Sequence, residues 1–124
     1  MKTVATEKAP AAIGPYSQAV VAGAMIYCSG QIPIVPASGS VIAGGIAPQT
    51  EQVLANLAAV LEAAGSSLQR VVKTTVYLAD MGDFRTMNEI YAKYLGDVKP
   101  ARSAIAVKAL PAGGLVEMDA VAMI

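Results

Sequence analysis

Two segments of helical periodicity interrupt a series of short apolar segments, and this order constrains the fold more than any other feature. The first helix is expected from Pro48 to about Ala64, where apolar residues recur every three to four positions before Gly65. The second is expected over Phe84–Leu95, with Asp83 as its N-cap and Gly96 as its end. The expected strands occupy residues 3–6, 17–22, 25–29, 71–79, 103–110 and 115–123.

Each expected helix lies between two strands, which is the arrangement of a crossover connection. Two such crossovers would place both helices on one face of a single mixed sheet. Segments 17–22 and 25–29 are expected to pair as a hairpin around Gly23, and 103–110 and 115–123 as a final hairpin. The sequence therefore predicts an α+β fold, one domain spanning 1–124, with the other face of the sheet left bare.

The amino-acid composition suggests what covers that bare face. Of the 124 residues, 55% are hydrophobic and only 15% are charged, which is more apolar than an ordinary soluble monomer. No apolar run reaches the roughly 18–20 residues that a membrane helix needs, so no membrane association is expected. We therefore expect a homo-oligomer in which the bare faces pack into a shared core.

The charges, the histidines and the cysteine restrict the chemistry. Nine basic residues balance nine acidic ones and aromatic residues are scarce, which argues against nucleic acid as a partner. The chain has no histidine, which removes Ser-His-Asp and Cys-His systems and most catalytic zinc sites; no metal or cofactor is expected. Its single cysteine, Cys28, and an N-terminus without the apolar core of a signal peptide predict a reducing cytoplasm.

Arg102 is the first candidate for a functional side chain. It stands two residues after Pro100, which favours an extended entry into the apolar segment that follows. A guanidinium held at the start of a strand suits bidentate binding of a small carboxylate. The alternative is a surface arginine that merely flanks a strand.

Glu117 and Asp119 are the second candidate, because they are two carboxylates inside an otherwise apolar strand. Alternation places them on the face opposite Val116 and Met118. Arg102 is a natural partner, but a simple hairpin register does not bring it opposite Glu117, so a bulge or a neighbouring subunit would be required. The alternative is a plain ion pair or a strand edge in water.

Three further positions could supply polar groups to a site. Tyr16 presents a phenol after a rigid Gly-Pro turn, and Ser29-Gly30 ends a strand where backbone can approach a ligand closely. Packing of the tyrosine ring and simple strand termination are the respective alternatives. With Arg for a carboxylate, Glu for a water and no histidine, the parts suit an intrinsically labile substrate, such as a carbon–nitrogen double bond that already hydrolyses in water.

Several stretches together resemble one known family along essentially the whole chain. They are Ile13-Gly14-Pro15-Tyr16-Ser17-Gln18-Ala19, Cys28-Ser29-Gly30-Gln31-Ile32-Pro33, Asn88-Glu89-Ile90-Tyr91, Pro100-Ala101-Arg102-Ser103 and Val116-Glu117-Met118-Asp119-Ala120. The chain is similar to the RidA/YjgF family of reactive-intermediate deaminases. The resemblance implies a chorismate-mutase-like fold and a homotrimer with sites between subunits. It also implies cofactor-free hydrolysis of 2-aminoacrylate and related imino acids, released by pyridoxal-phosphate enzymes, to 2-keto acids and ammonia.

The resemblance also implies roles for individual positions. Arg102 matches the carboxylate-binding arginine and Glu117 the acid that positions water, and the substrate-binding positions are Arg102, Tyr16, Ser29, Gly30, Asn88 and Ala104. Many members carry a cysteine where this chain has Ala104, which argues against a thiol-dependent side activity. Two alternatives stay open: an endoribonuclease or translation inhibitor, which the neutral charge disfavours, and a non-catalytic binder of small keto or amino acids that uses the same arginine.

Overall fold

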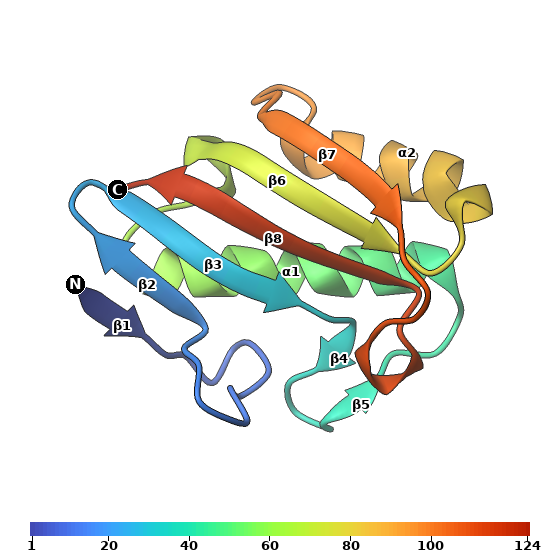
Figure 1. Cartoon of the computed structure of the whole chain (residues 1–124), viewed down its shortest axis with the longest axis horizontal. Coiled ribbons are helices and arrows are strands. Elements are labelled where there is room, and N and C mark those ends of the chain that lie inside the picture. The colour runs from blue at the N-terminus through green and yellow to red at the C-terminus, as the bar shows by residue number, and fades with distance from the viewer.

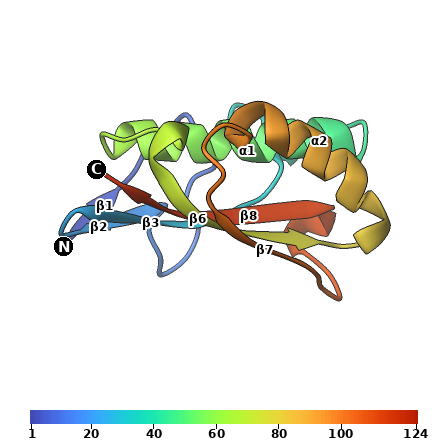
Figure 2. The same cartoon turned by 90° about the horizontal axis from the view of Figure 1, so that it is seen from above.

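The computed structural model describes residues 1–124 as a six-stranded sheet with two α-helices on one face (Figures 1 and 2). Short 3-10 turns at Leu68–Arg70, Met81–Asp83 and Pro111–Gly113 link some of the elements. The elements in chain order are β1 (Lys2–Val4), β2 (Ala19–Ala22), β3 (Met25–Gln31), β4 (Ile34–Val35), β5 (Ser40–Val41), α1 (Ile46–Ala63), β6 (Val71–Leu78), α2 (Phe84–Leu95), β7 (Ala101–Ala106) and β8 (Val116–Met123).

The sheet has the strand order β1-β2-β3-β8-β6-β7, and β4 and β5 form a separate two-stranded hairpin. All neighbours in the large sheet are antiparallel except β6 and β7, which are parallel. Helix α1 therefore connects β3 to β6 and α2 connects β6 to β7. The predicted α+β class, the mixed sheet and the two helical crossovers on one face are confirmed.

The predicted final hairpin is wrong. Strand β8 does not pair with β7 but lies between β3 and β6, while β7 pairs only with β6 and forms an edge of the sheet. The reason lies in how much each strand can bury. Four alternate residues of β8 are buried (Val116, Met118, Ala120 and Ala122), whereas β7 has no buried residue. The strand with the more apolar inner face occupies the centre, although β7 precedes it directly in sequence.

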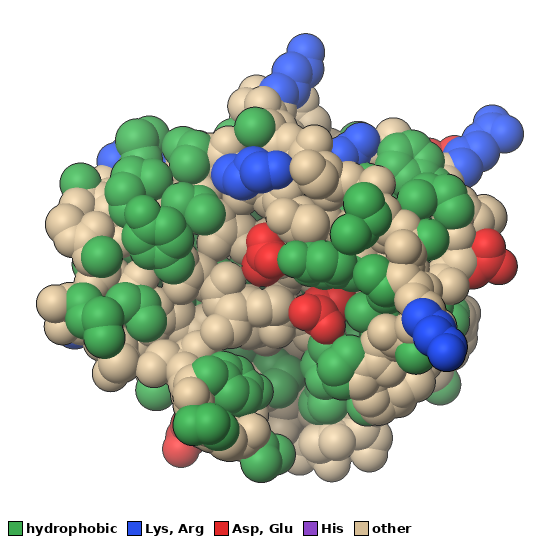
Figure 3. Space-filling view, in the orientation of Figure 1, with side chains coloured by type: hydrophobic (Ala, Val, Ile, Leu, Met, Phe, Trp, Pro, Cys, Tyr) green, Lys and Arg blue, Asp and Glu red, His purple; other side chains and the backbone are tan.

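The core lies between the sheet and α1. Val53, Leu54, Leu57, Val60 and Leu61 of this helix are fully buried. The opposite face of the sheet has no layer over it (Figure 2), so the predicted bare face is confirmed. Apolar side chains cover much of that face, with acidic ones near its middle (Figure 3).

The helix ends agree with the sequence in part. Helix α1 starts two residues before Pro48, and it ends as expected: Gly65 has φ 85° and Ser66 N–H donates to the Leu61 carbonyl at 2.9 Å. Asp83 stands at the N-cap position of α2, as expected, but its side chain makes no capping hydrogen bond. Asp80 accepts instead from Gly82 N–H at 2.8 Å, one short turn earlier.

Helix α2 ends after Leu95, with Gly96 at the C-cap position, as expected. Gly96 keeps a helical conformation, with φ −62°, so it does not break the helix by adopting left-handed backbone. Lys99 has that conformation, with φ 52°, immediately before Pro100. The chain therefore changes direction at Lys99, because Pro100 disfavours the right-handed helical region for the residue before it.

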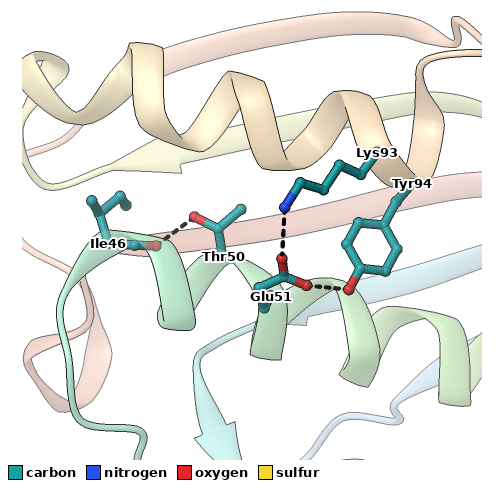
Figure 4. Close-up of polar contacts among 5 residues, drawn as sticks. All are labelled: Ile46, Thr50, Glu51, Lys93 and Tyr94. Carbon is teal, nitrogen blue, oxygen red and sulfur yellow. Dashed lines mark hydrogen bonds and ion pairs between the residues drawn. The ribbon is translucent and has the colours of Figure 1, made fainter.

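Polar contacts join the outer surfaces of the two helices (Figure 4). The Glu51 carboxylate accepts a hydrogen bond from the Tyr94 hydroxyl and lies 3.7 Å from Lys93 Nζ. This hydrogen bond raises the pKa of the Tyr94 hydroxyl. The contacts attach α2 to α1 and so help to place α2 over β6 and β7. Neither helix has the length and apolar character needed to cross a membrane.

The packing of α1 leads to a prediction about stability. Leu57→Ala removes a fully buried side chain from the interface between α1 and the sheet, so we expect the free energy of unfolding to fall by about 2–5 kcal/mol. Glu62→Ala, at an exposed position of the same helix, should change it by no more than about 0.5 kcal/mol. Urea denaturation followed by circular dichroism measures both; equal losses would contradict the assignment of the core.

Candidate functional site

A cavity of about 430 Å³ lies where β3 ends and β8 begins. Four of the predicted site residues line it: Tyr16, Ser29, Gly30 and Glu117. The remaining lining residues are Pro10, Ala11, Ile13, Gln18, Gln31, Ile32, Ile34 and Pro111. A larger hollow of about 640 Å³ along β1 shares only Tyr16 with the predicted residues, so the smaller cavity is the candidate site.

The loop before β2 is attached to the end of β3 through Ser29. The Ser29 hydroxyl donates to the Ser17 carbonyl at 2.6 Å, and its N–H donates to the Gln18 carbonyl at 2.9 Å. Because the Ser29 hydroxyl already donates its proton to the Ser17 carbonyl, it can only accept a hydrogen bond from a ligand. Tyr16 is 54% exposed and its hydroxyl makes no hydrogen bond within the chain, so its phenol is free to contact a ligand.

Gly30 makes room for the Glu117 carboxylate. The pairing of β3 with β8 shifts register between Cys28 and Gln31, which takes Gly30 out of the regular ladder. A Cβ on Gly30 would lie 2.9 Å from the Glu117 carboxyl carbon and still closer to one of its oxygens. Only glycine therefore lets the carboxylate lie directly against the backbone here. The sequence predicted a close approach at Gly30, but to a ligand rather than to Glu117.

Burial, and secondly the negative charge of Asp119, raises the pKa of the Glu117 carboxyl. Asp119 itself accepts a hydrogen bond from the Tyr77 hydroxyl at 2.9 Å. An acid whose pKa is higher in the folded chain than in the unfolded chain reduces stability at neutral pH, and this loss disappears as the pH falls below the pKa of the unfolded chain. Glu117 is thus held in an environment that favours its protonation.

Cys28 lies on the buried face of β3. Burial, and secondly the charge of Asp119, raises the pKa of its thiol to about 12. The thiol is therefore neutral at physiological pH and unsuited to nucleophilic attack. No group of three or more His, Cys, Asp or Glu side chains is placed to hold a metal ion.

Arg102 lies on β7 and points toward α2. Its Nη1 donates to Asn88 Oδ1 at 2.7 Å, and its guanidinium carbon lies 4.8 Å from the Tyr91 ring centroid and 5.5 Å from that of Phe84. The Tyr91 hydroxyl is in turn hydrogen-bonded to Thr74 at 2.7 Å. The guanidinium is therefore exposed but oriented, unlike a free surface arginine.

The contacts of Tyr91 and Phe84 with Arg102 were missed by the sequence reasoning, which gave neither residue a role in the site. Their spacing with Asn88, at i, i+4 and i+7, was an available signal. It places all three side chains on one face of α2, toward the strand that carries Arg102.

Within one chain, Arg102 and Glu117 do not meet. Arg102 aligns with Thr74 on β6 and shares the helix-covered face, as does Ala104, which packs against the core. Glu117 aligns with Tyr77, three residues further along β6, and lies on the bare face. The predicted site residues thus form two groups: Tyr16, Ser29, Gly30 and Glu117 in the cavity, and Asn88, Arg102 and Ala104 at the β7 edge.

The sequence profile of the family described as "Endoribonuclease L-PSP" matches residues 6–124. The chain belongs to this family, also called RidA/YjgF. It is 51% identical to the human 2-iminobutanoate/2-iminopropanoate deaminase over 122 residues, which cover 98% of this chain and 89% of the human protein. The predicted family membership is confirmed.

Solved structures of Rid relatives agree with the fold. A structure described as a putative endoribonuclease from Thermotoga maritima has a TM-score of 0.98 and 52% identity, with 100% of this chain and 98% of that chain covered. RidA from the Antarctic bacterium Psychrobacter has a TM-score of 0.96 and 45% identity, with 100% of both chains covered. The Rid fold therefore extends over the whole length described here.

The contact between Gly30 and Glu117 can be tested without any assay of activity. In Gly30→Ala the new methyl group displaces the carboxylate toward solvent, so the pKa of Glu117 should fall toward the ordinary value of glutamic acid. A carboxyl-carbon NMR titration of the two proteins measures the shift. Ala112→Gly, at a position of positive φ outside the cavity, is the control and should leave the pKa of Glu117 unchanged. An unaltered pKa in Gly30→Ala would contradict the packing described.

Proposed function

We propose that this chain is a hydrolytic deaminase of reactive 2-enamine and 2-imino acids, such as 2-aminoacrylate and 2-aminocrotonate, which it converts to 2-keto acids and ammonia. The relatives named 2-iminobutanoate/2-iminopropanoate deaminase, 51–52% identical over 98% of this chain, support the reaction. The observation that carries the proposal is a half-buried carboxylate of raised pKa, Glu117, that lines a cavity of the size of a small metabolite. No cofactor takes part in the proposed reaction.

The site would be completed between subunits of a homotrimer with a chorismate-mutase-like arrangement. The two groups of site residues stand on opposite faces of one sheet, so neither group alone both binds a carboxylate and activates water. The bare face exposes large apolar side chains, including Tyr27 at 50%, Ile105 at 45% and Met123 at 43%, which favours packing against further copies. The β7 edge of one copy would then face the cavity of its neighbour.

The proposed chemistry needs one group that binds the substrate carboxylate and one general base. Arg102, oriented by Asn88, would bind the substrate carboxylate with two parallel N–H donors. Glu117 would accept a proton from a water as the water oxygen bonds to C2 of the imine, and would return that proton to nitrogen. In the resulting carbinolamine the hydroxyl proton then passes through Glu117 to the nitrogen as the C2–N bond breaks, so that ammonia leaves and the keto acid remains. The Tyr16 hydroxyl and the Ser29 oxygen are available to hold the intermediate.

The direct experiment is hydrolysis of 2-aminoacrylate generated in the assay by a pyridoxal-phosphate dehydratase. Pyruvate and ammonia should appear faster than in buffer, and the absence of acceleration would overturn the proposal. Binding of a keto acid without turnover would instead favour the non-catalytic binder. The family description also names an endoribonuclease; with nine basic and nine acidic residues the chain offers RNA no net positive charge, so we expect no RNA cleavage.

Replacement of Arg102, the proposed binding group for the substrate carboxylate, should reduce turnover strongly. In Arg102→Lys a point charge replaces the planar fork and its stacking on Tyr91 is lost, so kcat/KM for 2-aminoacrylate should fall by about 10²-fold. Arg85→Lys is the matched control, since Arg85 lies on α2 with its side chain 93% exposed and pairs only with Glu89. An Arg102→Lys enzyme with unchanged kinetics would exclude Arg102 as the group that binds the substrate carboxylate.

The pH dependence should follow the ionisation of Glu117. Because the carboxylate is the active form, kcat/KM should fall as the pH decreases through the raised pKa of this group. Asp119→Asn removes one negative neighbour, so the pKa of Glu117 falls and the acidic limb of the profile moves to lower pH. Asp97→Asn, an exposed change outside the cavity, should leave the profile in place. Rates are taken after subtraction of hydrolysis in buffer at each pH. If the acidic limb lies at the same pH in Asp119→Asn and in the parent, the role of Glu117 is contradicted.

A further inference from the structure

Two buried side-chain amides bind the loop backbone that lines the cavity of Glu117. One is Gln18, which is 4% exposed. Its Oε1 accepts from Thr6 N–H at 2.7 Å, and its Nε2 donates to the carbonyls of Thr6 at 3.0 Å, Pro10 at 2.8 Å and, at the limit of a hydrogen bond, Ala9 at 3.4 Å.

The bonds of Gln18 replace the strand pairing that this segment lacks. Residues 5–18 between β1 and β2 contain no helix or strand, yet Pro10, Ala11, Ile13 and Tyr16 all line the cavity. Such a loop has no ladder of backbone hydrogen bonds to fix its path. Gln18 supplies both a donor and an acceptor from one side chain, and so determines where this wall of the cavity stands.

The other buried amide is Asn56, which extends from α1 and is 1% exposed. Its Nδ2 donates to the carbonyls of Ile32 at 3.1 Å and Ile34 at 2.9 Å. Its Oδ1 is occupied by Gln52 Nε2 at 2.9 Å. Ile32 and Ile34 form a second wall of the same cavity, so a helix on the covered side of the sheet holds the β3–β4 connection and the start of β4 at the site.

We propose that Gln18 and Asn56 are positioning residues, each of which holds one wall of the substrate cavity by donating hydrogen bonds to two or more main-chain carbonyls. The consequence for catalysis rests on the function proposed above, whereas the consequence for the loops does not. Neither side chain is expected to contact the reacting atoms. Both act through the backbone that carries the apolar lining residues.

The sharp test is to remove the donors while the shape of the side chain is kept. Gln18→Glu and Asn56→Asp retain the accepting oxygen but place a carboxylate against the carbonyls. We expect kcat/KM for imine hydrolysis to fall about tenfold in each variant. The loss should appear mainly as a higher KM, with kcat within about twofold of the parent, because the displaced walls bind substrate whereas Glu117 stays on β8.

The chain offers a matched control in Gln49, a third buried amide at 7% exposure. Its only hydrogen bond uses Oε1 as the acceptor for Leu115 N–H at 2.8 Å, and Glu retains that acceptor. Gln49→Glu therefore introduces the same buried charge without removing a donor that the backbone uses. Gln49→Glu should keep the kcat and KM of the parent. If its kcat/KM fell as much as that of the other two variants, the buried charge alone would explain the effect, and the proposal would be overturned.

Amide hydrogen exchange provides a readout that needs no turnover. Exchange should rise over residues 5–16 in Gln18→Glu and over 32–45 in Asn56→Asp, and over neither segment in Gln49→Glu. If the parent chain fails to hydrolyse imines, the proposed function fails and the exchange pattern still decides the positioning role. Unchanged exchange in both loops would overturn it. Should a carboxylate variant fail to fold, Gln18→Met and Asn56→Leu, which remove the donors without adding charge, are measured in its place.

Discussion

The close approach of the Glu117 carboxylate to the backbone at Gly30 is the constraint on which the rest of the site depends. It requires a residue without a Cβ, a register shift that removes that residue from the ladder, and a central strand rigid enough to hold the carboxylate there. Strand β8 meets the last requirement because β3 and β6 flank it and α1 covers its other face. A carboxylate on an edge strand would have none of these supports.

Strand β8 separates core packing from the cavity by face. Alternate residues of β8 either fill the core or project from the bare face, so Glu117 and Asp119 are placed by the same strand that buries Val116 and Met118. The arrangement reduces stability, since a half-buried carboxylate with a raised pKa is less favourable in the folded chain than in water. The fully buried leucines of α1 compensate for such a cost elsewhere in the core.

The fold was predictable from sequence where the signal is local, and it was missed where burial across the chain decides. The stripe of α1 and the stop at Gly65 depend on neighbouring residues, and both were predicted correctly. The pairing of β8 was not, because a turn between adjacent strands suggested a hairpin while the inner face of β8 was better buried between β3 and β6. A simple hairpin register already indicated that Arg102 does not lie opposite Glu117, but the placement of the two residues on opposite faces follows from the observed pairing.

The supports of the site were also beyond sequence reasoning, and for a related physical reason. Gln18 and Asn56 bind main-chain carbonyls 8 to 24 residues away, and a carbonyl leaves no trace in the residue type that carries it. The choice of amides nevertheless has a physical logic. An amide donates and accepts hydrogen bonds without titrating, whereas a carboxylate buried in the same place would be a second acid of raised pKa beside Glu117. With amides as supports, Glu117 is the one carboxyl group among the residues that line the cavity.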